Sequence, residues 1–450
     1  MPNRFCWTPA LLLGAHVVFT ACLGMAQTAT PAGPKVSTTN SIPTHYLNDS
    51  LPSWLRFTGE ERVRAEAYTG GGFHADDSDG YAVNRLRLQM TAGPVSWLRF
   101  RFQMQDSRVA GKDLKPYTPP YQDTFDLRIA YVEFGTGEDS PASLRVGRQE
   151  LNLGEERLVG SSGWSNTARS FDAARLTLRR GRFNLDAFAA SPVVLHDGGV
   201  GDHVAGNNLH GLYGGIQGVV PDAKIEPYVL WRLNQRQKTE TGGIGNLDFT
   251  TVGLRWIGKL RGGFDYSFEM AHQQGSLGTD RVSAWAGHWV VGYALGQAMG
   301  SRLVSEFNYA SGDSNSADGQ RHTFDSLFAG AHDKYGLADQ VGWKNIMHGR
   351  AGIEARPADR WTAASKLGAY WLADPHDAMY NSSGTAVVRK ADGSAGRFVG
   401  WEFDSLVSYA LSRQFQTGAG YAHLFPGEFL HRTTPGRGYN CFYLMLTAGL

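Results

Sequence analysis

The chain has 450 residues, of which 43 are lysine or arginine and 42 are aspartate or glutamate. This balance excludes a typical nucleic-acid-binding protein, which carries a clear basic excess. No stretch after residue 26 reaches the roughly 18–20 apolar residues that a transmembrane helix requires, so a membrane location would require strands.

The first 26 residues have the pattern of a secretory signal peptide. Arg4 supplies a positive charge, residues 10–23 form an apolar core, and residues 24–26 provide a small-residue cleavage site. The proline-containing, Ser/Thr/Asn-rich residues 27–50 predict a flexible lead on the periplasmic side. Removal of the signal peptide would leave Cys441 as the single cysteine, which excludes an internal disulfide.

Apolar and polar residues alternate in segments from residue 51 to the end. In WLRFRFQMQD, residues 97–106, arginines and glutamines alternate with apolar residues, which is the period of a strand with two different faces. Segments of about ten residues in even number are typical of outer-membrane barrels. The 18 predicted strands lie at 55–68, 83–92, 97–106, 125–135, 143–151, 171–180, 183–192, 209–219, 225–234, 249–258, 263–272, 284–295, 301–311, 346–356, 361–372, 398–411, 415–424 and 439–450.

Short and long connections alternate between these strands. Short turns at one rim and long loops at the other are the pattern of outer-membrane barrels, in which the short turns are periplasmic. We therefore predict an all-β fold over residues 51–450, a transmembrane antiparallel β-barrel of about 18 strands. The short turns include 93–96, 181–182, 357–360 and 412–414, and the long loops include 107–124, 152–170, 312–345 and 373–397.

The two faces of the strand at 97–106 can be assigned to lipid and lumen. An arginine that faces lipid at mid-membrane costs about 2–4 kcal/mol, so Arg99 and Arg101 are expected in the lumen and Phe100 and Phe102 on the lipid side.

Two long stretches resemble the alginate export family of outer-membrane barrels. They are LRVGRQELNLGEERLVGSSGWSNTARSFDAARL at 144–176 and NYASGDSNSADGQRHTFDSLFAGAHDKYGLADQVGWKNI at 308–346. The resemblance implies an 18-stranded barrel in the cell outer membrane, with a narrow electropositive pore for anionic uronate polymer. It also implies loops that gate both ends, and it allows periplasmic export or uptake components as partners.

Strand parity predicts which side chains line the lumen. The early strands contribute mostly arginines and the later strands mostly acids, with a lysine. Arginine suits carboxylate ligands because its planar guanidinium donates two parallel N–H bonds to one carboxylate and stays charged at any relevant pH. The predicted substrate path consists of Arg62, Arg64, Arg85, Arg87, Arg99, Arg101, Arg145, Gln149, Arg175, Arg179, Lys366, Glu402 and Asp404.

These features predict an outer-membrane channel that passes anionic saccharides, such as alginate or other uronate polymers and oligomers. Two other interpretations remain open: a plugged structural, ligand-binding or adhesive barrel, and a general small-solute porin. No G-x-S-x-G elbow or metal-ligand spacing occurs, so we expect no enzyme, no metal and no cofactor. The expected partners are outer-membrane lipid and an anionic saccharide, with no nucleic acid.

Overall fold

The computed structural model describes residues 43–113, 115–117, 119–136, 140–239, 242–296 and 300–450. The predicted signal peptide and residues 27–42 of the predicted lead lie outside the described residues. Within the described part of the chain, no helix is long and apolar enough to cross a membrane.

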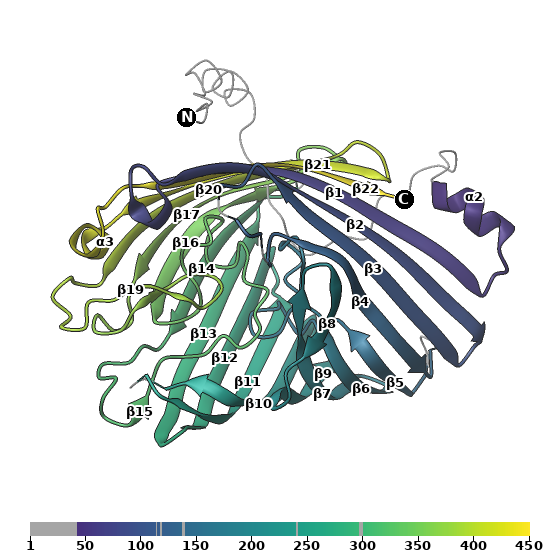
Figure 1. Ribbon diagram of the computed structural model, residues 1–450, viewed down its shortest axis with the longest axis horizontal. Coiled ribbons are helices and arrows are strands. Elements are labelled where there is room, and N and C mark those ends of the chain that lie inside the picture. Colours follow the sequence, from purple (N-terminus) through teal and green to yellow (C-terminus); the bar gives the residue numbers. More distant parts are fainter. Residues whose placement is uncertain (1–42, 114, 118, 137–139, 240–241, 297–299) are drawn as a thin grey trace, which may run out of the picture.

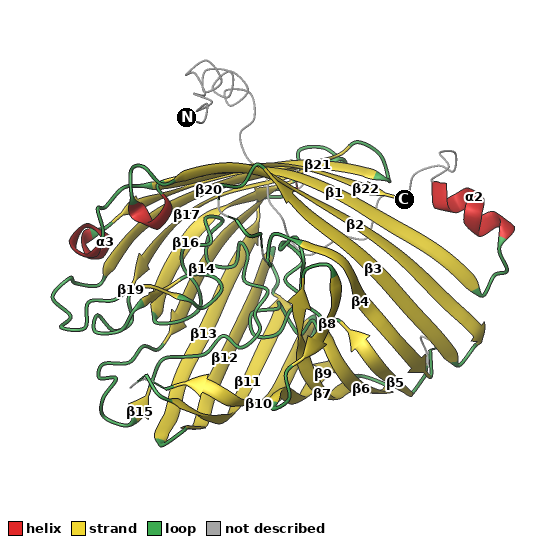
Figure 2. Cartoon of the chain, in the orientation of Figure 1, coloured by secondary structure: helices red, strands yellow, loops and turns green. Residues whose placement is uncertain are grey.

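Eighteen antiparallel strands form one closed sheet, shown as the yellow wall in Figure 2 and labelled in Figure 1. The last strand pairs with the first, from Glu60 opposite Gly449 to Thr69 opposite Asn440. The predicted fold is therefore confirmed. The wall strands are β1 (Leu55–Thr69), β2 (Ser78–Val95), β3 (Leu98–Ala110), β4 (Asp123–Phe134), β5 (Ala142–Gln149), β6 (Phe171–Arg180), β7 (Phe183–His196), β9 (Asn207–Gln217), β10 (Ala223–Lys238), β11 (Ile244–Lys259), β12 (Phe264–Leu277), β13 (Asp280–Ala294), β14 (Arg302–Ala310), β16 (Ile346–Ala355), β17 (Trp361–Trp371), β20 (Phe398–Ala410), β21 (Phe415–Pro426) and β22 (Tyr439–Gly449).

The other described elements are short and belong to the connections or to the N-terminal end. They are α2 (Pro43–Ser50), η1 (Gly71–Phe73), β8 (Gly199–His203), β15 (Gln320–Arg321), β18 (Met379–Tyr380), β19 (Ala386–Val388) and α3 (Glu428–Thr433).

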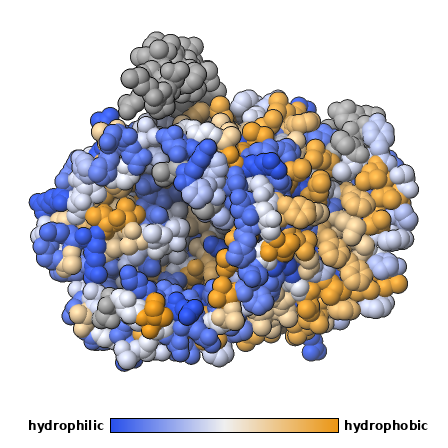
Figure 3. All heavy atoms as spheres, in the orientation of Figure 1, coloured by the Kyte–Doolittle hydropathy of each residue, from blue (hydrophilic) through white to orange (hydrophobic). Residues whose placement is uncertain are grey.

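The outward face of the wall is apolar, as the alternating sequence requires. On β3, Phe102 and Met104 are 40% and 44% exposed, whereas Gln105 and Ser107 on the opposite face are buried. Figure 3 shows apolar side chains gathered on the right of the view, over the wall, and hydrophilic ones on the left, over the loops. The surface is hollowed near the centre of the same view.

The long connections fold into the barrel and form much of the buried core. Phe324, Tyr335 and Trp343 of the connection after β14 are at most 1% exposed, and they share one apolar cluster with Leu209 and Leu230 of the wall. Figure 2 shows these connections as green loops inside the yellow wall. One connection at the rim of the long loops is short, because only residues 278 and 279 join β12 to β13.

Helix α2 lies beside the seam at which the sheet closes (Figure 1). Strand β22 pairs with β1 only from Glu60 onward, so the preceding residues of β1 extend beyond that strand. The side-chain amide of Asn48 makes the hydrogen bonds that a neighbouring strand would make there. It donates to the Phe57 carbonyl at 2.7 Å and accepts the Phe57 N–H at 2.8 Å. Thr44 Oγ1 donates to the Leu450 carbonyl at 2.5 Å. Residues 43–50 of the predicted lead thus form a helix, which these contacts hold at the seam.

Replacing Phe102 by arginine should impair barrel assembly, because the charge would face lipid at a cost of about 2–4 kcal/mol. Arg101→Gln should assemble normally, since Arg101 lies on the inner face. The folded fraction is measured by the heat-dependent migration of the barrel on gels. Equal folded fractions, or the reverse order, would contradict the assignment of the two faces.

Replacing Asn48 by alanine should lower the free energy of unfolding by about 1–2 kcal/mol, because two hydrogen bonds at the seam are lost. Urea unfolding of the barrel in vesicles measures the change. Asp49→Ala, one residue along the same helix, is the matched control. If both variants unfold at the same urea concentration, α2 does not stabilise the seam.

Candidate functional site

The tip of the connection after β5 binds three of the predicted lumen arginines. Arg62 donates to the carbonyls of Gly163 and Trp164 at 2.9 Å each and to that of Ser165 at 3.2 Å. Arg64 donates to the Trp164 carbonyl at 2.7 Å, and Arg85 donates to the Gly163 and Ser165 carbonyls at 3.0 and 3.2 Å. All three arginines are only 3–5% exposed. We call Arg62, Arg64 and Arg85 the anchor arginines and residues 163–165 the loop tip.

Trp164 links the loop tip to the connection between β14 and β16. Its ring lies 3.6 Å from the Arg64 guanidinium and stacks on the His332 ring with 3.8 Å between centroids. His332 Nδ1 lies 2.6 Å from Asp339 Oδ2. The loop tip is therefore held from the wall on one side and from a second loop on the other.

The two loops also pair through their backbones. A parallel bridge joins Val159 to Phe328, and the Gly330 N–H donates to the Glu156 carbonyl at 2.8 Å. Arg169 donates to the Phe328 carbonyl at 2.6 Å. Burial lowers the pKa of Arg169 to about 10, so this guanidinium stays charged at neutral pH. We call residues 150–170 and 311–345 together the inner plug.

Two acids of β20 bind the backbone of the same plug, and only β22 and β21 separate β20 from β1 in the closed sheet. Glu402 Oε1 accepts the Ala338 N–H at 2.9 Å, and Asp404 Oδ1 accepts the Leu337 N–H at 3.1 Å. Both carboxylates are buried. Lys366, on the neighbouring strand β17, pairs instead with Glu354 at 2.9 Å. Strands β1, β2 and β20 therefore hold the plug through neutral peptide groups. The arginines of β1 and β2 bind carbonyls, and the acids of β20 bind N–H groups.

A row of charged side chains crosses four neighbouring strands nearer the short turns. The register places Arg99, Glu133, Arg145 and Arg175 directly opposite one another on β3, β4, β5 and β6. Glu133 lies 3.4 Å from Arg99 and 2.9 Å from Arg145. Arg175 pairs with Asp186 at 2.7 Å. Like charges directly opposite in a sheet are destabilising, so the Arg145–Arg175 neighbours are not explained by stability. We call these four residues the arginine row.

Three further arginines of the inner face have no carboxylate partner in the described part of the chain. Among the described residues, Arg87, Arg101 and Arg179 make no ion pair; Arg87 Nε donates to Gln105 at 2.7 Å, and Arg179 is exposed. The guanidiniums of Arg101 and Arg145 lie 5.8 and 4.5 Å from the Tyr131 ring. One buried N–H of Arg101, Nε, has no acceptor.

The structure therefore divides the predicted path residues into groups. Arg62, Arg64 and Arg85 meet at the loop tip, and Glu402 and Asp404 meet at the other loop. Arg99, Arg101, Arg145, Arg175 and Arg179 lie in or beside the arginine row, and Arg87 lies between Arg101 and the anchor arginines. Gln149 is buried and donates to the Ala173 carbonyl at 3.0 Å, so it bonds within the wall.

Sequence reasoning missed Glu133 and Tyr131 on β4. The alternation of inward and outward residues along this strand is irregular, because its pairing with β3 shifts register twice, after Gln103 and after Gln105. The contacts of the loop tip were also missed. Backbone carbonyls are common to every residue, so no sequence signal marks Gly163 as a ligand of arginine.

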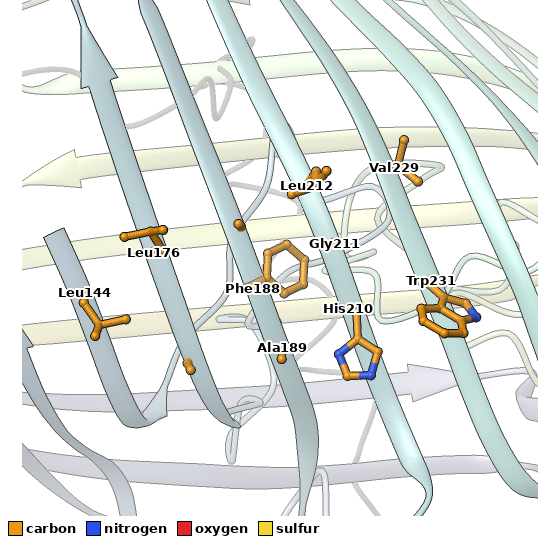
Figure 4. A pocket seen from close by; sticks show the side chains of 11 residues that line it. Leu144, Leu176, Phe188, Ala189, His210, Gly211, Leu212, Val229 and Trp231 are labelled. Carbon is orange, nitrogen blue, oxygen red and sulfur yellow. The ribbon is translucent and has the colours of Figure 1, made fainter. Parts of the chain in front are cut away.

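A groove of about 480 Å³ lies on the outer surface of the wall, away from these charges (Figure 4). Leu176, Leu212, Val229 and Trp231 project from its strands, and each is 37–49% exposed. Three alanines, at 174, 187 and 189, are among its other lining residues. It belongs to the apolar face that a barrel presents to lipid.

The sequence matches the Alginate export family over residues 53–443. No curated protein matches the sequence. Three solved structures share this fold at 9–12% sequence identity. OpdK of Pseudomonas aeruginosa with vanillate has a TM-score of 0.60 at 9% identity, covering 88% of this chain and 98% of its own.

Two further solved structures share the fold at similarly low sequence identity. OpdO of Pseudomonas aeruginosa has a TM-score of 0.59 at 12% identity, covering 88% of this chain and 97% of its own. OccAB2 of Acinetobacter baumannii has a TM-score of 0.58 at 12% identity, covering 88% and 98%. With the family match over most of its length and this closed barrel, the chain belongs to the alginate export family and is an outer-membrane channel protein.

Proposed function

We propose that this channel conducts anionic saccharides of the uronate class, as alginate-type polymer or oligomers, along the arginine row. The observation that carries the proposal is the row itself, in which three arginines and one glutamate stand side by side across β3 to β6. A wall built only for strength would alternate the two signs, because like neighbours repel.

The charge around the row is not balanced by direct partners. Six arginines (Arg87, Arg99, Arg101, Arg145, Arg175 and Arg179) share two carboxylates, Glu133 and Asp186, in their ion pairs. Three of the six, Arg87, Arg101 and Arg179, are therefore left without a carboxylate contact among the described residues. Sugar carboxylates would find paired N–H donors there, and arginine binds them at any physiological pH.

The opposite wall carries a balanced ladder. Arg302 lies 2.5 Å from Asp265 and 2.7 Å from Glu354, and Lys366 lies 2.9 Å from the same glutamate. A positive wall facing a neutral one attracts an anion to one side without enclosing it in positive charge. Conduction requires such sites, favourable to enter and weak enough to leave.

A second candidate is a plugged barrel that binds ligands or supports the membrane without conduction. The observation that favours it is the inner plug, which β1, β2 and β20 hold by several hydrogen bonds. A general small-solute porin is the third candidate. It predicts conductance with little preference between charged and neutral sugars of equal length.

The double variant Arg101→Gln with Arg145→Gln should shift ion selectivity toward cations, with about 1 kcal/mol of attraction lost per site in a water-filled lumen. Reversal potentials in a salt gradient measure the shift. Arg180→Gln, on the outward face of β6 beside Arg179, is the matched control and should behave as wild type. Identical potentials for the double variant and the control would mean that the arginine row lies off the conducting path.

Block of the wild-type current by trigalacturonate should weaken in high salt, because the Debye length falls to about 3 Å near 1 M. The measurement is the blocked fraction of the current at rising salt. Maltotriose, a neutral trisaccharide, controls for size. Salt-independent block, or equal block by both sugars, would contradict recognition by charge.

A further inference from the structure

We propose that the anchor arginines form a carboxylate-binding site that the loop tip occupies in this structure. An anionic saccharide would release the loop tip by taking its place on Arg62, Arg64 and Arg85. The inference rests on the proposed function for the identity of the ligand, but it concerns a different set of arginines from the arginine row.

The first support is the chemistry of the contact. Three guanidiniums make six hydrogen bonds to three successive carbonyl oxygens, at 2.7–3.2 Å. A carbonyl is a neutral acceptor, whereas a carboxylate accepts two parallel N–H bonds from one guanidinium and makes stronger bonds. The loop tip therefore occupies donors for which a carboxylate is the better ligand.

The second support is the charge and burial of the site. Arg64 pairs with Glu66 at 2.7 Å and Arg85 with Glu60 at 2.6 Å, but Arg62 makes no ion pair among the described residues. Arg62 and Arg85 stand directly opposite each other in the register of β1 and β2. The Nε of each is buried without an acceptor. A cluster with surplus positive charge and spare buried donors fits an anion better than it fits peptide carbonyls.

The third support is continuity with the arginine row. Arg85 and Arg87 share the inner face of β2, and Arg87 stands opposite Gln105 on β3, whose inner face also carries Arg101. An anion that leaves Arg101 would next meet Arg87 and then the anchor arginines. The loop tip covers the last of these positions.

The base of the loop is held by neutral contacts that an anion would not displace. Asn166 Nδ2 donates to the carbonyls of Asn84, Arg108 and Tyr121 at 2.9–3.1 Å. Gln105 donates to the Thr167 carbonyl at 2.7 Å. Release would therefore move the loop tip while the base stays on the wall. Trp164 would leave both Arg64 and the His332 ring, which loosens the link to the second loop.

The test follows the mobility of the loop tip. Gly163→Cys in a Cys441→Ala background accepts a nitroxide label, since a Cβ at position 163 meets no atom within 4 Å. Trigalacturonate should raise the ratio of mobile to immobile label by about tenfold, the shift expected when charged hydrogen bonds replace neutral ones. Maltotriose should leave the ratio unchanged.

Two variants distinguish ligand binding by the anchor arginines from a purely structural role in holding the loop tip. Arg62→Lys keeps the positive charge but loses the paired N–H donors of the planar guanidinium, so the response to trigalacturonate should weaken. Arg62→Gln with Arg85→Gln should free the loop tip without ligand and abolish the response. Arg180→Gln should respond as the parent does.

The outcomes distinguish this inference from the proposed function. A channel that is anion-selective but whose label at position 163 ignores trigalacturonate overturns the inference and leaves the proposed function standing. A response to both sugars, or an unchanged response in Arg62→Lys, also overturns it. A channel without anion selectivity whose label still responds to trigalacturonate alone supports the anchor site and contradicts the proposed function.

Discussion

The closure of the sheet between β1 and β22 is the constraint on which the other features depend. Lipid offers no partner for a peptide N–H or C=O, so a strand protein can cross a membrane only if every strand has two neighbours. Closure then divides side chains strictly between lipid and lumen. Phe102 and Met104 face outward, whereas Arg62 and Arg85 are buried in the interior. Even the edge of β1 beyond the reach of β22 is paired, through the amide of Asn48.

Inside the barrel, arginines of the same sequence pattern have two different kinds of partner. Near the loops, Arg62, Arg64 and Arg85 bind backbone carbonyls of the loop tip. Nearer the short turns, the three arginines of the arginine row share two carboxylates, Glu133 and Asp186, so positive charge exceeds negative charge there. The kind of partner that each arginine has is set by where the loops fold, because the strands carry the same sequence pattern in both places. A buried guanidinium requires acceptors, and a loop that enters the lumen supplies them with peptide oxygens.

The strands and their faces could be predicted because they follow from local alternation, as in Arg99 to Phe102. The arginines gathered on the early strands could be predicted for the same reason. The inner plug could not, because its contacts join Trp164 to His332 and Val159 to Phe328, residues far apart in the sequence. Glu133 was missed because bulges hide the parity of β4. Residues 43–50 read as a flexible lead because the contacts that hold them as a helix lie at the seam.

The central claim is that the unmatched arginines make the lumen a path for carboxylate-bearing sugars. The most direct measurement is the current of the unmodified protein in planar bilayers under a salt gradient, before and after addition of trigalacturonate or maltotriose. The account predicts an anion-selective current that trigalacturonate blocks and maltotriose does not. A silent barrel, or a cation-selective current indifferent to trigalacturonate, would contradict it.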